Sequence, residues 1–251
     1  MTEQVRIEQA DGVLSILLDR PDRRNAITVA MYAALADAIS SAAGDESVRL
    51  ITLRGAGVDF TAGNDLSDFL ATPPGSGSEK EAPVWRLLRA LAVNDVPILA
   101  AVQGNAVGIG TTMLFHCDLV IAEEGCRFLM PFVNLGLVPE AASSLLMPKL
   151  SGRRAAARHL LLGEPFGASE ALALGIASHV APAGGLATMF EQIRTSLLAK
   201  PAQALRLTQK LLRTSDRDEV VERMSLENGH FGERLASDEV KQAIAAFFRA
   251  R

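Results

Sequence analysis

Short apolar runs separated by turn signals open the chain. Val5 to Ile7 and Val13 to Leu18 are apolar-rich and are separated by Ala10-Asp11-Gly12. This arrangement predicts a β-hairpin. After Pro21 ends the second run, Thr28 is an N-cap candidate for a helix through Ala43, because apolar residues recur there at helical spacing.

The middle of the chain repeats one pattern. Apolar runs suited to buried strands occur at Val48 to Leu53, Pro97 to Val102 and Leu119 to Ala122. Glycine-bearing loops follow the first two, and Gly108-Ile109-Gly110 opens a helix to about Phe115. Strand, strand and helix recur in this order, which indicates an α/β protein of stacked β-β-α units better than a doubly wound sheet.

From about Pro139 the chain is predicted to be almost wholly helical. We divide the sequence into a core of residues 1–190 and a C-terminal helical region of residues 191–251. Periodic apolar residues in that region need a partner surface, which either self-association or packing within the chain would supply. The expected helices are Ala168 to Leu174, Leu186 to Ala199, Ala202 to Leu212, Glu219 to Glu233 and Asp238 to Arg249.

Composition narrows the class of protein. The 251 residues are 49% hydrophobic and 22% charged, with a net charge of −4, so no global field favours nucleic acid or an anionic membrane. The absence of a long apolar segment and of a leader-like N-terminus predicts a cytoplasmic protein without a membrane span. Cys117 and Cys126 lack metal-ligand spacing and are expected to be buried thiols, with no metal site. A Pro/Gly/Ser stretch, Thr72 to Ser78, is a candidate mobile lid.

Two glycine segments carry the first candidate chemistry. Gly63 and the Gly108/Gly110 pair directly follow predicted buried strands and lie near helix starts, where backbone N–H groups lack partners. Two such N–H groups converging on one point would stabilise an oxyanion, although each glycine can also serve only as a tight turn. Met113 occupies the place of the third glycine of G-x-G-x-x-G, so this segment is not a dinucleotide-binding fingerprint. Ser144 is not surrounded by the G-x-S-x-G nucleophile elbow, so the sequence does not indicate a serine hydrolase.

Three further motifs follow one another along the chain. They are Arg20-Pro21-Asp22-Arg23-Arg24-Asn25-Ala26, Phe60-Thr61-Ala62-Gly63-Asn64-Asp65-Leu66, and Ala101-Val102-Gln103-Gly104-Asn105-Ala106-Val107-Gly108-Ile109-Gly110 with Cys117-Asp118 after it. In order and spacing they resemble the successive motifs of the crotonase (enoyl-CoA hydratase/isomerase) superfamily, and the resemblance extends from about Val5 to the C-terminus. It implies a crotonase-like spiral of β-β-α units with a C-terminal helical region.

The resemblance implies an acyl-CoA thioester as substrate, with coenzyme A as part of that substrate and no separate cofactor. The oxyanion donors are then the backbone N–H groups of Asn64 and Ile109. Ala62 and Leu66 match adenine and pantetheine contacts. Arg23 and Arg24 lie where the chain passes the CoA phosphates, although exposed arginines can also be merely solvated. A homotrimer or a dimer of trimers is expected, with the C-terminal helices at the interface.

The acidic residues favour one reaction. Family hydratases use two glutamates, whose positions are occupied here by Thr112 and Phe132. Glu140 resembles the single catalytic glutamate of peroxisomal-type Δ3-Δ2-enoyl-CoA isomerases, and Phe132 and Leu137 are candidate apolar walls that would raise its pKa. The alternatives are a helix-dipole role for Glu140, a hydratase with atypical residues, and a non-catalytic acyl-CoA binder. Asp65 is assigned a structural role as an N-cap or turn residue.

Overall fold

The computed structural model describes residues 4–71 and 81–249, so the candidate lid at Thr72 to Ser78 lies outside the described residues. The predicted hairpin is confirmed. Strands β1 (Val5–Ala10) and β2 (Val13–Leu18) pair antiparallel. Asp11 and Gly12 turn the chain between them at φ of 50° and 78°, the left-handed conformation that a tight hairpin turn requires.

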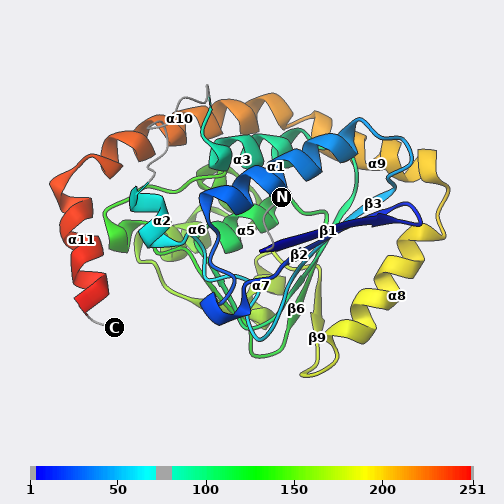
Figure 1. Ribbon diagram of the computed structural model, residues 1–251, viewed down its shortest axis with the longest axis horizontal. Helices are drawn as coiled ribbons and strands as arrows, with labels where there is room; N and C mark the ends of the chain where they lie inside the picture. Colours follow the sequence, from blue (N-terminus) through cyan, green and yellow to red (C-terminus); the bar gives the residue numbers. More distant parts are fainter. Residues whose placement is uncertain (1–3, 72–80, 250–251) are drawn as a thin grey trace.

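A six-stranded sheet forms the centre of the molecule (Figure 1). Its order is β1-β2-β3-β4-β6-β9, and all neighbours from β2 onward are parallel. The added strands are β3 (Leu50–Gly55), β4 (Ile98–Val102), β6 (Leu119–Glu123) and β9 (His179–Ala181). Every residue of β4 is buried, as expected for a strand covered on both faces.

Helices cover both faces of this sheet. Alternate residues of a strand point to opposite faces, and here both faces carry apolar side chains that the helices bury. Ile98 and Ala100 of β4 belong to the large apolar cluster, which includes helices α1 (Val29–Ala43) and α3 (Pro83–Val93). Leu99 and Ala101 point the other way, toward Phe190 of α8 (Leu186–Leu198). The predicted N-cap of α1 is confirmed, since the side chain of Thr28 accepts from the N–H of Met31 at 3.3 Å.

A second, three-stranded sheet has the order β5-β7-β8. The chain leaves β4 for β5 (Asn105–Val107) and then enters α4 (Ile109–Thr112), which continues as the 3-10 helix η2 (Met113–His116). It leaves β6 for β7 (Arg127–Leu129) in the same way. This alternation between two sheets confirms the predicted β-β-α units, although β5 and β7 are too short to stand out in the sequence pattern.

The prediction of an almost wholly helical chain after Pro139 is wrong in two places. Phe166–Gly167 is strand β8, and His179–Ala181 is strand β9 of the main sheet. Strands of this length have no readable alternation, and pairing with distant strands determines them. The rest is helical, in α5 (Ser143–Ser151), α6 (Arg153–Leu161), α7 (Ala168–Ala173), α9 (Ala202–Thr214), α10 (Arg217–Leu235) and α11 (Asp238–Arg249).

Helices α9 and α10 run across the top of the molecule in Figure 1, and α11 descends at its left-hand end. The predicted boundary between residues 190 and 191 falls inside α8. Within the described parts of the chain, no helix is both long and apolar enough to cross a membrane.

Candidate active site

The two glycine segments run side by side in the structure. Thr61 forms an isolated parallel bridge with Ala106, in which the Thr61 N–H donates to the Asn105 carbonyl at 3.0 Å and the Val107 N–H donates to the Thr61 carbonyl at 3.1 Å. Asn64 follows Thr61 by three residues, and Ile109 follows Ala106 by three. The shared register therefore brings both positions to the same end of the paired segments.

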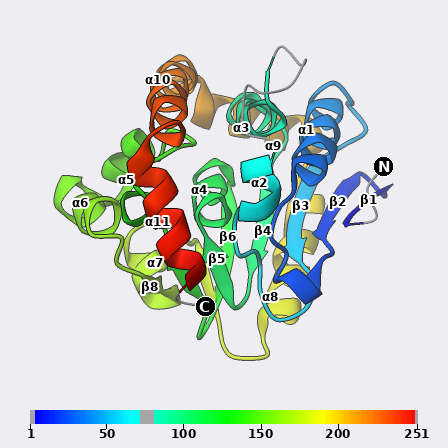
Figure 2. The same ribbon diagram turned by 60° about the vertical axis from the view of Figure 1, so that its left-hand side comes forward.

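The glycines allow the two backbone segments to approach closely, so they do more than form tight turns. Gly63 has a φ of +86°, and a Cβ there would lie 2.5 Å from the carbonyl oxygen of Val107. A Cβ on Gly110 would lie 2.5 Å from Cγ2 of Thr61. Both distances are shorter than any ordinary nonbonded contact, so these positions require glycine. Figure 2 shows α4, which Gly110 helps to open, near the centre of the molecule.

The N–H groups of Asn64 and Ile109 have no acceptor among residues 4–71 and 81–249. The neighbours of Asn64 are paired, since the Ile27 N–H donates to the Gly63 carbonyl at 2.8 Å and the Asp65 N–H donates to the Ile27 carbonyl at 2.9 Å. Ile109 is the first residue of α4, where a helix leaves its N–H groups unpaired. Both groups can therefore donate to an anionic oxygen.

Glu140 lies beside this pair, held by α4. Its Oε1 accepts a hydrogen bond from the hydroxyl of Thr112, one turn after Ile109. Its Oε2 is buried and has no hydrogen-bond partner in the part of the chain that the structure describes. Burial raises the pKa of Glu140 from 4.5 to about 8; the Thr112 hydrogen bond opposes this shift, and the charge of Glu227 adds to it. The predicted walls, Phe132 and Leu137, are both buried in the large apolar cluster. Glu140 is thus a buried carboxyl group with one oxygen free to exchange a proton.

Tyr32 bonds to the side chain of Asn64 and lies within electrostatic range of Glu140. Its hydroxyl donates to Oδ1 of Asn64, and the side chain is fully buried on α1. Burial raises the pKa of Tyr32 well above 10, and the nearby charge of Glu140 raises it further. Tyr32 therefore remains a neutral donor that fixes the Asn64 side chain.

Three residues of this site were not predicted from the sequence. They are Tyr32, Thr112 as a hydrogen-bond donor, and Glu227. For Glu227 a signal exists, because it shares the buried stripe of α10 with Val220, Met224 and Phe231. A charged residue within an apolar helical stripe marks a buried polar contact. Tyr32 and Thr112 gave no such signal, since their partners come from remote segments.

The predicted CoA contacts belong to the first and second motifs, which are hydrogen-bonded to each other at Ala62. The Ala62 N–H donates to the Arg24 carbonyl at 2.9 Å, and Leu66 begins helix α2 (Leu66–Ala71). The side chains of Arg23 and Arg24 are both 68% exposed, and their nearest carboxylates are 3.9 and 3.8 Å away. Both guanidinium groups are therefore accessible to an anion.

Asp65 has the structural role expected of it. Its Oδ1 accepts from the N–H groups of Ser67 and Asp68, each at 3.2 Å, at the start of α2. Its Oδ2 pairs with Arg20 at 2.7 Å. Arg20 is thereby held in a close ion pair, whereas Arg23 and Arg24 have only long contacts of 3.9 and 3.8 Å to carboxylates.

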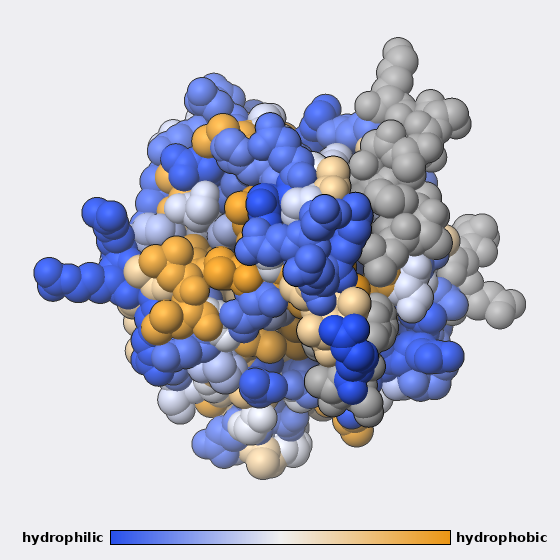
Figure 3. Space-filling model, turned by 90° about the vertical axis from the view of Figure 1, so that its left-hand side faces the viewer, coloured by the Kyte–Doolittle hydropathy of each residue, from blue (hydrophilic) through white to orange (hydrophobic). Residues whose placement is uncertain are grey.

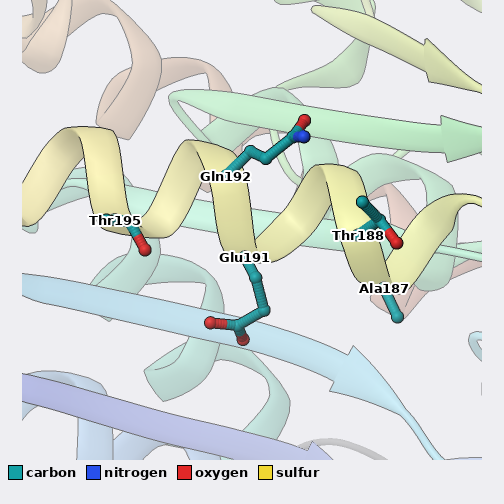
Figure 4. Close-up of a pocket in the computed structure, with 5 residues that line it drawn as sticks. All are labelled: Ala187, Thr188, Glu191, Gln192 and Thr195. Atoms are coloured by element: carbon teal, nitrogen blue, oxygen red, sulfur yellow. The ribbon is translucent and has the colours of Figure 1, made fainter.

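A shallow depression on the outer face of α8 is remote from these groups (Figure 4). It is lined by one exposed helix face alone and contains none of the residues described above. The lining residues are Ala187, Thr188, Glu191, Gln192 and Thr195.

Comparisons with known proteins agree with the fold and the motifs. Residues 8–251 match the enoyl-CoA hydratase/isomerase family. The chain is 31% identical to the 1,2-epoxyphenylacetyl-CoA isomerase of Escherichia coli K12, covering 100% of this chain and 97% of the relative. It is 32% identical to human enoyl-CoA delta isomerase 2, covering 98% of this chain but 63% of that longer protein.

A solved structure is also similar along its whole length. The enoyl-CoA hydratase/isomerase of Pseudoalteromonas atlantica T6c superposes with a TM-score of 0.92 at 37% identity, covering 99% of this chain and 98% of that one. Relatives of comparable identity include proteins named as hydratases and dehalogenases, so overall similarity does not select one reaction.

Proposed function

We propose that this chain, which belongs to the enoyl-CoA hydratase/isomerase family, is a Δ3-Δ2-enoyl-CoA isomerase with Glu140 as its base. The observation that carries the proposal is the buried Oε2 of Glu140, which has no hydrogen-bond partner among residues 4–71 and 81–249. The same carboxyl group is bonded to Thr112 of α4, the helix that begins with the unpaired N–H of Ile109. The names of two relatives, both CoA isomerases, agree with it.

The reaction needs one base and one anion site. Ionised Glu140 removes a proton from C2 of the 3-enoyl thioester, and the electron pair of the C2–H bond moves toward the thioester oxygen, giving a dienolate. The N–H groups of Asn64 and Ile109 donate to that oxygen. Glu140 then returns the proton to C4, the C2–C3 double bond forms and the thioester carbonyl is restored. The substrate gains and loses no atoms.

Hydration requires more than this site offers. Adding water across the conjugated double bond needs a group that activates water as well as one that delivers a proton. Thr112 and Phe132 occupy the two positions where family hydratases carry glutamates, and the Thr112 hydroxyl is engaged with Glu140. A threonine hydroxyl is a poor general base at neutral pH, which favours proton transfer over hydration.

The rest of the thioester would follow the second motif. In this proposal Ala62 and Leu66 contact the adenine and pantetheine portions, and the exposed guanidinium groups of Arg23 and Arg24 meet the phosphates. Guanidinium suits phosphate because it donates two parallel hydrogen bonds. Coenzyme A enters as part of the substrate, and the proton transfer itself requires no separate cofactor.

The direct test is to incubate the protein with 3-enoyl-CoA thioesters of several chain lengths and to follow the absorbance of the conjugated 2-enoyl product. We expect isomerisation without hydration of that product. Hydration as the main reaction would instead assign the protein to the hydratases. Acyl-CoA binding without turnover would make it a non-catalytic binder, and failure to bind any CoA thioester would remove the oxyanion role altogether.

The pKa of Glu140 predicts a specific pH dependence. Only the ionised carboxylate can accept a proton, and with a pKa of about 8 about one-tenth of the molecules are ionised at pH 7. We expect kcat/KM to rise about tenfold per pH unit below this value and to level off above it. A pH profile measured with a 3-enoyl-CoA checks this, and a profile that is flat between pH 6 and 9 would contradict it.

We also propose that the chain assembles as a homotrimer or a dimer of trimers through its C-terminal helices. Helix α9 turns its polar side inward, where Arg206, Gln209 and Arg213 bond to backbone carbonyls of the core. Its leucines face outward, with Leu207, Leu211 and Leu212 exposed by 59%, 75% and 73%. Apolar faces of this kind mark contact surfaces.

Replacing Leu211 by aspartate should therefore weaken the assembly. Light scattering on a sizing column is expected to give three or six times 26.7 kDa for the unmodified chain and a smaller mass for Leu211→Asp. Lys210→Ala, on the same helix, is the control. Figure 3 shows that hydrophobic residues also gather on the face at the α11 end of the molecule. A monomeric unmodified chain would contradict the proposal.

A further inference from the structure

A buried carboxylate from a distant helix holds the segment that follows Glu140. Glu227 of α10 accepts from the Ala142 N–H at 2.6 Å through Oε2 and from the Ser144 N–H at 3.0 Å through Oε1. Ala142 lies 85 residues before Glu227 along the chain. The two donors belong to the start of α5, where a helix leaves its N–H groups unpaired, so Glu227 supplies a cap from outside the helix.

The held segment has an unfavourable backbone conformation. Ala141 and Ala142 follow Glu140 directly and have φ values of 59° and 56°. The left-handed region is disfavoured for alanine because Cβ crowds the following carbonyl oxygen, and two such residues in succession persist only when their surroundings hold them. The segment after the base is therefore dependent on its contacts.

Three contacts hold this turn besides the helix itself. His116 lies with Nε2 2.8 Å from the Ala141 carbonyl, and the hydroxyl of Ser143 donates to the Glu140 carbonyl at 2.6 Å. Burial lowers the pKa of His116 to about 4, so the imidazole is neutral and donates through Nε2. Glu227 is the third contact and the one that brings a charge.

We propose that Glu227 is a positioning residue for the base, which holds the left-handed turn after Glu140 and places a second negative charge behind the base. This inference rests on the proposed isomerase function of Glu140. Glu227 does not touch the reacting atoms in this scheme, and it acts on them only through Glu140.

The charges around the pair fix the direction of the electrostatic effect. Burial raises the pKa of Glu227, but two N–H donors and nearby Arg223 favour its ionised form. The resulting negative charge contributes to the raised pKa of Glu140. Among the described residues, the other titratable groups near the pair are Tyr32 on α1 and His116 on η2, both of which are neutral. Arg213 of α9 is bonded to the His116 carbonyl. Removing the charge of Glu227 should therefore lower the pKa of Glu140.

The test compares pH profiles. Glu227→Gln keeps the size of the side chain and one acceptor oxygen while removing the charge. We expect the rise of kcat/KM with pH in this variant to occur at a pH about one unit lower than in the unmodified enzyme. We also expect kcat to be reduced severalfold and KM to change little. Glu222→Gln, an exposed residue of the same helix, makes the same charge change and should leave the profile unaltered. A Glu227→Gln profile that coincides with that of the unmodified enzyme, with only a lower Tm, would overturn the proposal.

A second variant separates position from charge. Glu227→Asp keeps the charge but is one methylene too short to reach both N–H groups. We expect a lower kcat, with the rise of kcat/KM near its original pH. An aspartate variant that matches the unmodified enzyme in kcat would refute the positioning role, and it remains informative if the glutamine variant does not fold.

The role proposed for Glu227 can be tested even if the isomerase assignment is wrong. If the unmodified chain does not turn over 3-enoyl-CoA, the isomerase assignment fails by itself. The ionisation of Glu140 can then be followed by infrared difference titration, with its carboxylic acid band identified by its loss in Glu140→Gln. We expect Glu227→Gln to lower the midpoint of that band, and an unmoved midpoint would refute the electrostatic role.

Discussion

Glu140→Gln is expected to lower kcat for 3-enoyl-CoA isomerisation by about 10²–10⁴-fold, the usual contribution of a general base. Glutamine has nearly the same size and retains an oxygen to accept from the Thr112 hydroxyl, so substrate binding should change little. The amide cannot take up the C2 proton. Stopped assays at high enzyme concentration, together with acyl-CoA titration, measure both quantities.

A surface carboxylate provides the control for Glu140→Gln. Glu124 is exposed in the turn after β6, and Glu124→Gln should leave the rate unchanged. Full isomerase activity in Glu140→Gln would remove Glu140 from the mechanism and direct attention to another base.

The same substitution has a second consequence, for stability. The folded-state pKa of Glu140 is about 8, against 4.5 for the free side chain, so the folded protein binds the proton more tightly than the unfolded chain does. This stabilising contribution is complete below pH 4.5 and is lost as the pH rises through about 8. Glutamine stays neutral throughout. Thermal melts should therefore show that the Tm of Glu140→Gln, relative to the Tm of the unmodified chain, increases between pH 6 and pH 9.

Gly63→Ala is expected to reduce kcat by about 10²–10³-fold, comparable with removal of one oxyanion donor. The new Cβ would lie 2.5 Å from the Val107 carbonyl oxygen, and neither backbone segment can yield without moving the N–H groups of Asn64 and Ile109 apart. The free energy of unfolding should also fall by about 1–3 kcal/mol, because alanine is strained at this φ. Kinetics and chemical denaturation measure the two effects separately.

Gly125→Ala is the matched control for that change. Gly125 has a φ of +87°, almost the same as Gly63, but a Cβ there meets nothing within 4 Å. It should share the loss of stability without the loss of rate. Equal losses of activity in the two variants would mean that backbone strain, and not the contact with Val107, is responsible.

Much of the fold follows from local pattern. The hairpin, the Thr28-capped helix α1 and the buried strand β4 each have a run of residues long enough to show its period, and the structure confirms them. Strands β5, β7, β8 and β9 span two or three residues each, and only pairing with distant strands defines them. A pattern within one short segment carries no information about such pairing.

The candidate site divides in the same way. Local pattern predicts unpaired N–H groups near Gly63 and the Gly108/Gly110 pair, because these glycines lie at strand ends and helix starts. The choice of Asn64 and Ile109 within those segments comes from the resemblance to the crotonase superfamily. The environment of Glu140 could not be derived in this manner, since Thr112, Tyr32 and Glu227 come from three separate helices. Burial is the main cause of the raised pKa of Glu140, and it exists only once these separate segments have packed together.

The parallel register of the Thr61 and Ala106 segments also determines which changes this site can absorb. The two proposed donors are main-chain groups, each three residues after one member of the Thr61–Ala106 bridge, so the side chains of Asn64 and Ile109 can vary while the N–H groups stay in place. A single inserted or deleted residue between Thr61 and Asn64, or between Ala106 and Ile109, would shift one N–H group along its segment. The two N–H groups would then no longer point to the same oxygen. Chain length in these two short segments is thus under a stricter constraint than side-chain chemistry.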